Sequence, residues 1–158
     1  MTEAIREGDI PGVQLRRRRQ LTGASVATVW SWLTEPARLV LWLADEAQVE
    51  LREGGALRLT RGHSPRPEVE LGETVHLEAP RRWVVSFRRE RWSLATRLEL
   101  EITDGRTGAE LSVLQSGFER LPLSEGLTVW EAYRRRWTVA LDRLAMRISE
   151  AGAPASGD

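Results

Sequence analysis

The sequence predicts an α+β fold in which a curved antiparallel sheet of about seven strands surrounds a long C-terminal helix, in the order β-α-α-β6-α. Three observations predict it. The middle of the chain alternates apolar and polar residues in short segments joined by turns, which is typical of an antiparallel meander. Two short stretches near the start and one long stretch at the end repeat with helical spacing instead. One helix cannot cover the inner face of so many strands unless the sheet curls around it.

Near its start the chain is predicted to form one strand and two short helices. The strand covers residues 13–21, where a period of two places Arg17 and Arg19 on the face of the apolar residues. Apolar residues at helical spacing predict a helix over 25–33. The run Thr34-Glu35-Pro36 predicts a second helix start with Thr34 as its N-cap, because threonine caps well and proline suits the first turn.

Six further strands and one long helix follow. Alternation predicts the strands over 47–51, 57–59, 69–77, 83–87, 94–102 and 111–115. The helix is predicted to begin at Thr128, because Thr128 and Glu131 have the spacing of a capping box, and to end at Gly152. Its apolar stripe is Trp130, Tyr133, Trp137, Leu141, Leu144 and Ile148.

Length and composition indicate a single globular domain. A chain of 158 residues buries roughly 70% of its unfolded surface, and we expect the domain over 13–150 with flexible termini at 1–12 and 152–158. The chain has no cysteine, which excludes disulfides and thiolate chemistry. No run of about 18 apolar residues predicts a membrane span, and residues 1–11 lack the apolar core of a signal peptide. We therefore expect a cytoplasmic protein.

The motifs of common enzymes and metal sites are missing from the sequence. It contains no G-x-S-x-G, Walker or GxGxxG motif. His63 and His76 are the only histidines and lack the spacing of a metal site, so both are interpreted as surface residues. The sequence predicts no catalytic residue, no metal and no cofactor.

All 23 basic residues are arginines, and 23 acidic residues balance them. The simplest interpretation is a genome whose codons favour arginine. Nucleic-acid binding needs a basic field, which a net charge of zero with interleaved carboxylates does not provide. The clusters, including Arg134 to Arg136, are therefore interpreted as solvated faces, with Glu131 and Arg135 forming an i,i+4 pair.

Polar residues at inward positions of the sheet are the most informative candidates for function. Glu73, Thr96 and Gln115 fall on inward parities, together with Arg17 or Arg19. A buried polar group needs a partner, so these residues form either a ligand-orienting cluster or an internal network such as a Glu73–arginine salt bridge. A single β-bulge would reverse these assignments.

Several local signatures, taken in order, resemble the helix-grip proteins of the START-like (SRPBCC, Bet v-type) superfamily, and within it the bacterial family related to the activator of the heat-shock-protein-90 ATPase. The resemblance covers about residues 13–150. Gln115 stands where members often have a histidine, so no titrating group is expected there. The matching segments are Val29-Trp30, Leu33-Thr34-Glu35-Pro36, Trp42-Leu43, Gly54-Gly55, Gly72 to Pro80, Gly108 to Phe118, and Tyr133, Trp137 and Leu141.

The resemblance implies a cavity for apolar ligands between the sheet and the long helix. The leading hypothesis is a small-molecule binding or carrier protein whose partner is a hydrophobic or amphipathic molecule. A second hypothesis is an interaction protein that modulates a chaperone ATPase or self-associates through exposed apolar residues such as Leu114. A third is a cyclase or hydrolase that would use Glu73 or Tyr133 inside the cavity. The expected lining is Trp42, Leu57, Glu73, Trp83, Phe87, Thr96, Leu98, Val113, Gln115, Tyr133 and Trp137.

Overall fold

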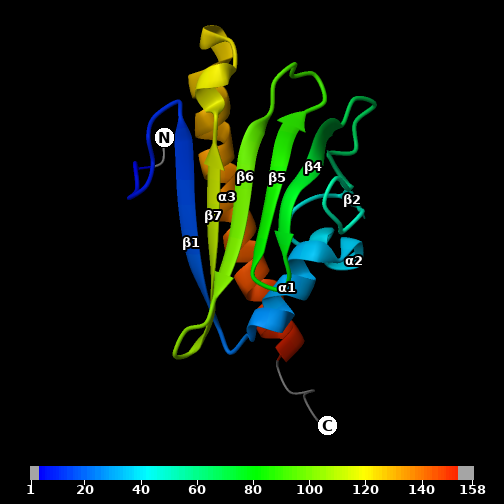
Figure 1. Ribbon diagram of the computed structural model, residues 1–158, viewed down its shortest axis with the longest axis vertical. Coiled ribbons are helices and arrows are strands. Elements are labelled where there is room, and N and C mark those ends of the chain that lie inside the picture. The colour runs from blue at the N-terminus through cyan, green and yellow to red at the C-terminus, as the bar shows by residue number, and fades with distance from the viewer. Residues whose placement is uncertain (1–3, 153–158) are drawn as a thin grey trace.

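The computed structural model describes residues 4–152 and has the predicted element order. Its strands form one antiparallel sheet in the order β1-β7-β6-β5-β4-β3-β2 (Figure 1). The alternating segments of the sequence thus predicted the strands correctly. Their bounds are β1 (Gln14–Thr22), β2 (Glu46–Val49), β3 (Ala56–Arg61), β4 (Glu68–Glu78), β5 (Arg82–Arg89), β6 (Thr96–Thr103) and β7 (Gly108–Ser116).

Two short helices connect β1 to β2. Ser25 caps α1 (Val26–Thr34), because its side chain accepts a hydrogen bond from the Thr28 N–H at 3.1 Å. The predicted N-cap of α2 (Pro36–Leu39) was wrong by one residue. Glu35 occupies that position and Pro36 begins the helix, whereas Thr34 ends α1 and donates its hydroxyl to the Trp30 carbonyl oxygen at 2.8 Å.

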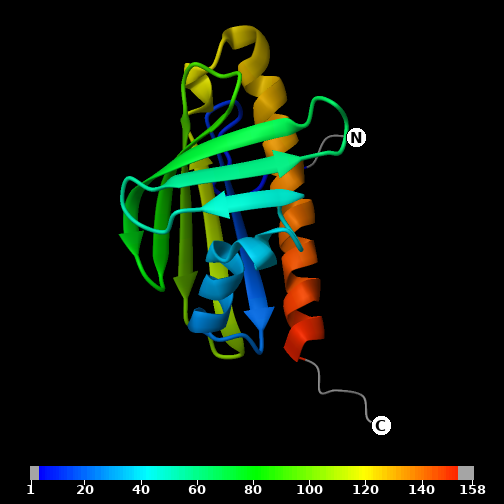
Figure 2. The same cartoon turned by 90° about the vertical axis from the view of Figure 1, so that its right-hand side faces the viewer.

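The sheet is strongly bent around α3 (Leu123–Gly152). Figure 2 shows β2, β3 and β4 crossing the direction of α3, whereas β1 and β7 run along it. At Gly72 of β4 the backbone comes close to β5, since an added Cβ would lie 2.6 Å from Val85 Cγ1. A larger residue at this position would therefore displace the Val85 side chain, which packs over Gly72.

The long helix begins five residues earlier than the capping box predicted. It follows the short 3-10 helix η1 (Phe118–Arg120), and the Pro122 carbonyl oxygen accepts hydrogen bonds from the N–H groups of Glu125 and Gly126. Thr128 therefore lies inside α3. The predicted apolar stripe is confirmed, because all its members are buried: Trp130, Tyr133, Trp137, Leu141, Leu144 and Ile148.

The segment before β1 packs against α3 through Asp9. The Asp9 carboxylate lies 3.1 Å from the Arg17 guanidinium and 3.2 Å from that of Arg134, and all three side chains are buried. The expectation that residues 1–12 are flexible thus does not describe Asp9, which has fixed partners. The sequence predicted that Arg134 lies on a solvated face. This prediction was wrong, because the Arg134 side chain is buried. Of the expected flexible tail 152–158, only Gly152 lies within the described residues.

The pKa of Asp9 makes its contribution to stability dependent on pH. Burial alone raises this pKa, but hydrogen bonds from the backbone N–H groups of Arg6 and Arg16 and the charge of Arg17 outweigh burial and lower it. A lowered pKa in the folded state stabilises the protein above the unfolded pKa of about 3.9. This stabilisation is lost as the pH falls through the lower folded value.

We therefore expect Asp9→Asn to lower the free energy of unfolding by about 3–5 kcal/mol at pH 7, because it leaves two buried guanidinium groups without their shared carboxylate. The difference between the two proteins should shrink as the pH falls below about 4. Urea unfolding of both proteins from pH 7 to pH 3 measures it. A difference that stays constant with pH would contradict the assignment.

Candidate functional site

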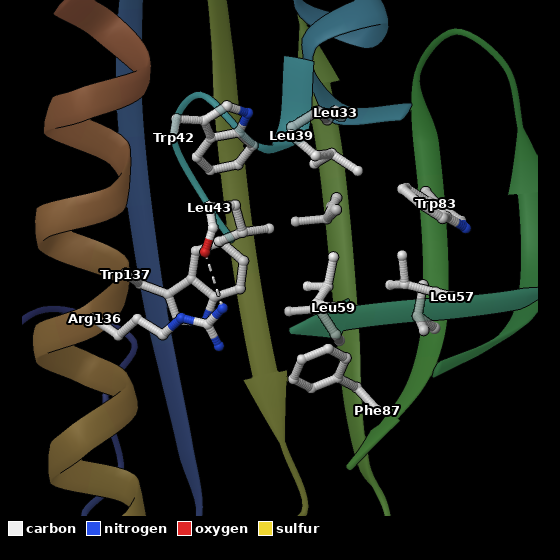
Figure 3. Close-up of a pocket in the computed structure, with 13 residues that line it drawn as sticks. Leu33, Leu39, Trp42, Leu43, Leu57, Leu59, Trp83, Phe87, Arg136 and Trp137 are labelled. Carbon is white, nitrogen blue, oxygen red and sulfur yellow. Dashed lines mark hydrogen bonds between the residues drawn. The ribbon is translucent and has the colours of Figure 1, made fainter. Parts of the chain in front are cut away.

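An apolar chamber lies between the bent sheet, the two short helices and α3 (Figure 3). Its volume is about 20 Å³, because large side chains from every surrounding element fill most of the interior. Arg136 is the one charged residue of its lining, and every other lining residue is apolar. The lining residues are Leu33, Leu39, Trp42, Leu43, Leu57, Leu59, Trp83, Val85, Phe87, Leu98, Leu100, Arg136 and Trp137.

An open cleft of about 520 Å³ adjoins the chamber, and Trp42, Leu43 and Arg136 separate the two spaces. It runs between the segment 40–45, the end of β3 and one face of α3, and its lining contains four arginines. The remaining lining residues are mostly small or apolar. The full lining is Val40, Trp42, Leu43, Ala44, Asp45, Arg61, Gly62, Ala132, Arg135, Arg136, Val139, Ala140 and Arg143.

Three residues border both the chamber and the cleft, and we refer to them as the wall: Trp42, Leu43 and Arg136. The Trp42 indole donates to the Trp32 carbonyl oxygen at 3.0 Å. The Arg136 guanidinium donates to the Leu43 carbonyl oxygen at 3.2 Å, which ties the segment 40–45 to α3 (Figure 3). The wall is therefore held by a few polar contacts in addition to apolar packing.

Behind the wall, Arg136 also pairs with Glu70, whose side chain is fully buried. The Tyr133 hydroxyl donates to Glu70 Oε2 at 2.5 Å, and the Arg61 guanidinium lies 3.8 Å from the same oxygen. Burial, followed by the negative charge of Glu70, raises the pKa of Tyr133, so the phenol stays protonated. Burial, followed by the neighbouring charge of Arg136, lowers the pKa of Arg61. Two guanidinium groups thus share one carboxylate at the inner end of the cleft.

Gln115 and Thr96 are buried but form an internal network, with neither residue in the chamber lining. The Gln115 side chain accepts a hydrogen bond from the Trp137 indole at 2.9 Å and donates to the Thr96 hydroxyl at 3.1 Å. Thr96 in turn donates to the Phe87 carbonyl oxygen at 2.7 Å. Of the two alternatives for these inward polar residues, the structure has the internal network.

Glu73 was expected on the inner face but lies exposed on the outer face of β4. Glu70 and Thr74 face inward instead, and a bulge between Thr74 and His76 reverses the parity of the following residues. Leu77, at the inward parity predicted for it, packs against the core because it follows the bulge. Since a shift by one residue exchanges the two faces of a strand, alternation alone favoured the wrong glutamate.

Six of the eleven expected residues line the chamber: Trp42, Leu57, Trp83, Phe87, Leu98 and Trp137. Val113 and Tyr133 are fully buried but are not part of the lining. Leu33, Leu39 and Leu43 were not predicted, because periodicity does not show how two short helices and the segment after them close a cavity. Arg136 was not predicted either, although its place beside Trp137 on α3 was a usable signal. The other unpredicted lining residues lie on strands: Leu59, Val85 and Leu100.

His63 and His76 lie at the surface, each beside a carboxylate: His63 is 3.4 Å from Asp45, and His76 is 3.4 Å from Glu78. Within residues 4–152, no group of three or more His, Cys, Asp or Glu side chains could hold a metal ion. No helix in the same range is both long and apolar enough to span a membrane.

A curved sheet that grips one long helix around an apolar chamber defines a START-like helix-grip domain. The family model described as "Activator of Hsp90 ATPase homolog 1-like protein" matches residues 23–148, and the chain belongs to this family. No curated protein matches the chain.

Several solved structures have the same fold. A Rhodobacter sphaeroides protein is 22% identical with a TM-score of 0.74, over 92% of this chain and 99% of that one. A Mesorhizobium loti protein is 15% identical with a TM-score of 0.75, over 89% and 99% of the two chains. CalU16 from Micromonospora echinospora is 28% identical with a TM-score of 0.62, over 87% and 76%.

The Gln115 network predicts a specific energetic coupling. Gln115→Leu should destabilise the fold by about 1–3 kcal/mol, because it leaves the buried Trp137 indole N–H without an acceptor. Trp137→Phe removes that donor, so its cost should be smaller in the Q115L background than in the wild type. Urea unfolding of the two single variants and the double variant measures the coupling, expected at about 0.5–3 kcal/mol. Additive costs would contradict the network.

Proposed function

We propose that this protein binds an apolar or amphipathic small molecule between the bent sheet and α3. The observation that supports the proposal most is the chamber itself, whose lining is apolar except for one arginine at the side of an open cleft. Ligand sites typically combine apolar walls with a few polar groups that fix orientation. The apolar walls would supply most of the affinity through burial of ligand surface.

The chamber must enlarge to accept such a ligand. Its volume of about 20 Å³ holds about one water molecule, whereas ligand pockets usually measure about 300–1,000 Å³. The adjoining cleft of about 520 Å³ lies within that range and is separated from the chamber only by the wall. Movement of residues 40–44 would join the two spaces, while the Asp45 N–H stays bonded to the Thr60 carbonyl oxygen near the end of β3.

Two hydrogen bonds tie that segment to α3, in addition to the apolar packing of Trp42 and Leu43. The Arg136 guanidinium binds the Leu43 carbonyl oxygen, and the Arg147 guanidinium binds the Leu41 carbonyl oxygen at 3.2 Å. Val40 and Leu41 are already about two-fifths exposed, whereas the buried Trp42 would have to move with the segment, and a bound apolar ligand would cover the surface that its movement exposes. We propose that a ligand enters by this route.

The positions of the titratable groups favour binding over catalysis in the chamber. Glu73, the leading candidate for an acid or base, lies on the outer face. Tyr133 is held protonated by its burial and by Glu70, and neither residue lines the chamber. The hypothesis of a partner surface at Leu114 also has little support, because this residue is half-buried between Arg16 and Glu99 of the neighbouring strands.

We expect a bound ligand to raise the melting temperature. At 100 times its dissociation constant, a ligand specific for the folded state adds about 2.7 kcal/mol, which for this chain length is a rise of about 5–11 °C. The screen should contain fatty acids, sterols, flat aromatic compounds and polyketide-like compounds. Binding beside Trp42, Trp83 and Trp137 should also change the intrinsic fluorescence.

A variant with a filled chamber provides the control. Leu59→Phe places a larger side chain among the lining residues and should abolish the ligand-induced shift. Leu111→Phe makes the same change at a buried position outside the lining and should keep the shift. Each change alone should cost about 1–3 kcal/mol from overpacking. If no class of compound shifts the melt, or if both variants lose the shift equally, the proposal fails.

A further inference from the structure

We infer that the open cleft binds the anionic end of an amphipathic ligand, with Arg61 and Arg136 at its inner end and Arg143 and Arg135 at its outer rim. This inference rests on the proposed function and specifies its ligand class: an apolar body for the chamber and a carboxylate, sulfonate or phosphate group for the cleft.

The charges that line the cleft are unbalanced. Four arginines line it, and Asp45 is the only carboxylate in the lining. Asp45 is already engaged, because it accepts a hydrogen bond from the Gly62 N–H at 2.7 Å and lies 3.4 Å from His63. Glu70 lies behind the lining and is shared by Arg61 and Arg136. An anion in the cleft would complete this charge arrangement.

Two of the arginines have no acidic partner within residues 4–152. The i,i+4 pair expected between Glu131 and Arg135 does not form, because Glu131 pairs with Arg134 at 3.1 Å. Arg135 and Arg143 are exposed at the rim and make no ion pair with any described residue. Both can therefore turn toward a ligand without breaking a salt bridge.

At the inner end, the two guanidinium groups are close enough to disfavour each other's charge. Burial and the charge of Arg136 both lower the pKa of Arg61, and only about a third of the Arg61 side chain is exposed. A ligand anion between them would relieve this repulsion. The guanidinium groups also offer several N–H donors each, which suits the oxygens of an anionic group.

The remaining cleft surface suits the apolar part of such a ligand. On α3 the lining residues recur at helical spacing, so that the arginines alternate with Ala132, Val139 and Ala140 along one face. Val40 and Leu43 form the opposite side. The cleft leads to the wall, where Arg136 contacts both Glu70 and the Leu43 carbonyl oxygen. An anion that draws Arg136 away from Leu43 would loosen the wall, so headgroup binding and opening of the chamber are coupled.

Two fluorescent probes with the same apolar body test the inference. Anilinonaphthalenesulfonate carries one sulfonate, and N-phenylnaphthylamine is the same molecule without it. Both become brighter in apolar surroundings, so titrations give both affinities for the folded wild type. We expect the sulfonate to bind at least tenfold more tightly, because one charge-assisted hydrogen bond accounts for about that factor. Raising the salt concentration should weaken the sulfonate more than the neutral probe.

The variants locate the effect. Arg61→Gln and Arg143→Gln should each reduce the preference for the sulfonate, by about tenfold at the half-buried Arg61 and about threefold at the exposed Arg143. Arg106→Gln removes the same charge from the exposed hairpin between β6 and β7 and should leave the preference unchanged. Melting curves in the absence of probe confirm that each variant is folded.

The outcomes separate the two proposals. If both probes bind equally well, or if the preference survives both cleft substitutions, the anion site is wrong while ligand binding in the chamber stands. If the sulfonate alone binds and Leu59→Phe does not weaken it, the cleft is not connected to the chamber, which also overturns the inference. If neither probe nor any compound of the melting screen binds, the proposed function itself fails.

Discussion

The apolar stripe of α3 must be buried against a sheet that is wider than one helix can cover, and the remaining architecture follows from this constraint. The sheet bends around α3 and so covers the stripe, with β2, β3 and β4 crossing the helix instead of running along it. The close approach at Gly72 lies within this bent part. The two short helices then close the open side with Leu33 and Leu39. An apolar chamber is what this packing leaves at the centre.

Tryptophan makes up much of this interior, and four of the buried indoles pair their N–H group, whereas the buried Trp92 N–H has no partner among the described residues. The indole N–H groups of Trp42, Trp83, Trp130 and Trp137 all donate to an oxygen, at distances of 2.7–3.0 Å. Such pairing removes the cost of burying a polar group and holds each large ring in one orientation. It also leaves the chamber lining without a polar side chain except Arg136, so polar recognition of the proposed ligand would fall to Arg136 and the cleft beyond it.

Periodicity was sufficient to predict the strands, the helical stripe and therefore the fold class. Periodicity was insufficient where a shift of one residue decides which side chain faces inward, and where the partners of a side chain lie far away in the sequence. The bulge after Thr74 lets Leu77 face inward although Glu73, at the same parity, faces outward, and nothing in a period-2 pattern reveals such a shift. The partners of Asp9 were also beyond prediction, because they are contributed by β1 and α3, about 8 and 125 residues further along the chain. Long-range contacts of this kind depend on the completed fold.

The use of arginine for every basic residue needs no functional explanation as a whole. Several sites nevertheless depend on properties that lysine lacks. Arg136 contacts the Glu70 carboxylate with one nitrogen and the Leu43 carbonyl oxygen with another. A planar guanidinium presents these donors in fixed directions, whereas an ammonium group is a single rotating point. Arg134 likewise reaches Asp9 and Glu131 from different nitrogens. The guanidinium group that holds the wall could therefore donate to an incoming anion in place of the Leu43 carbonyl oxygen while it keeps its contact with Glu70. In the proposed binding mode, wall movement and anion binding would both depend on Arg136.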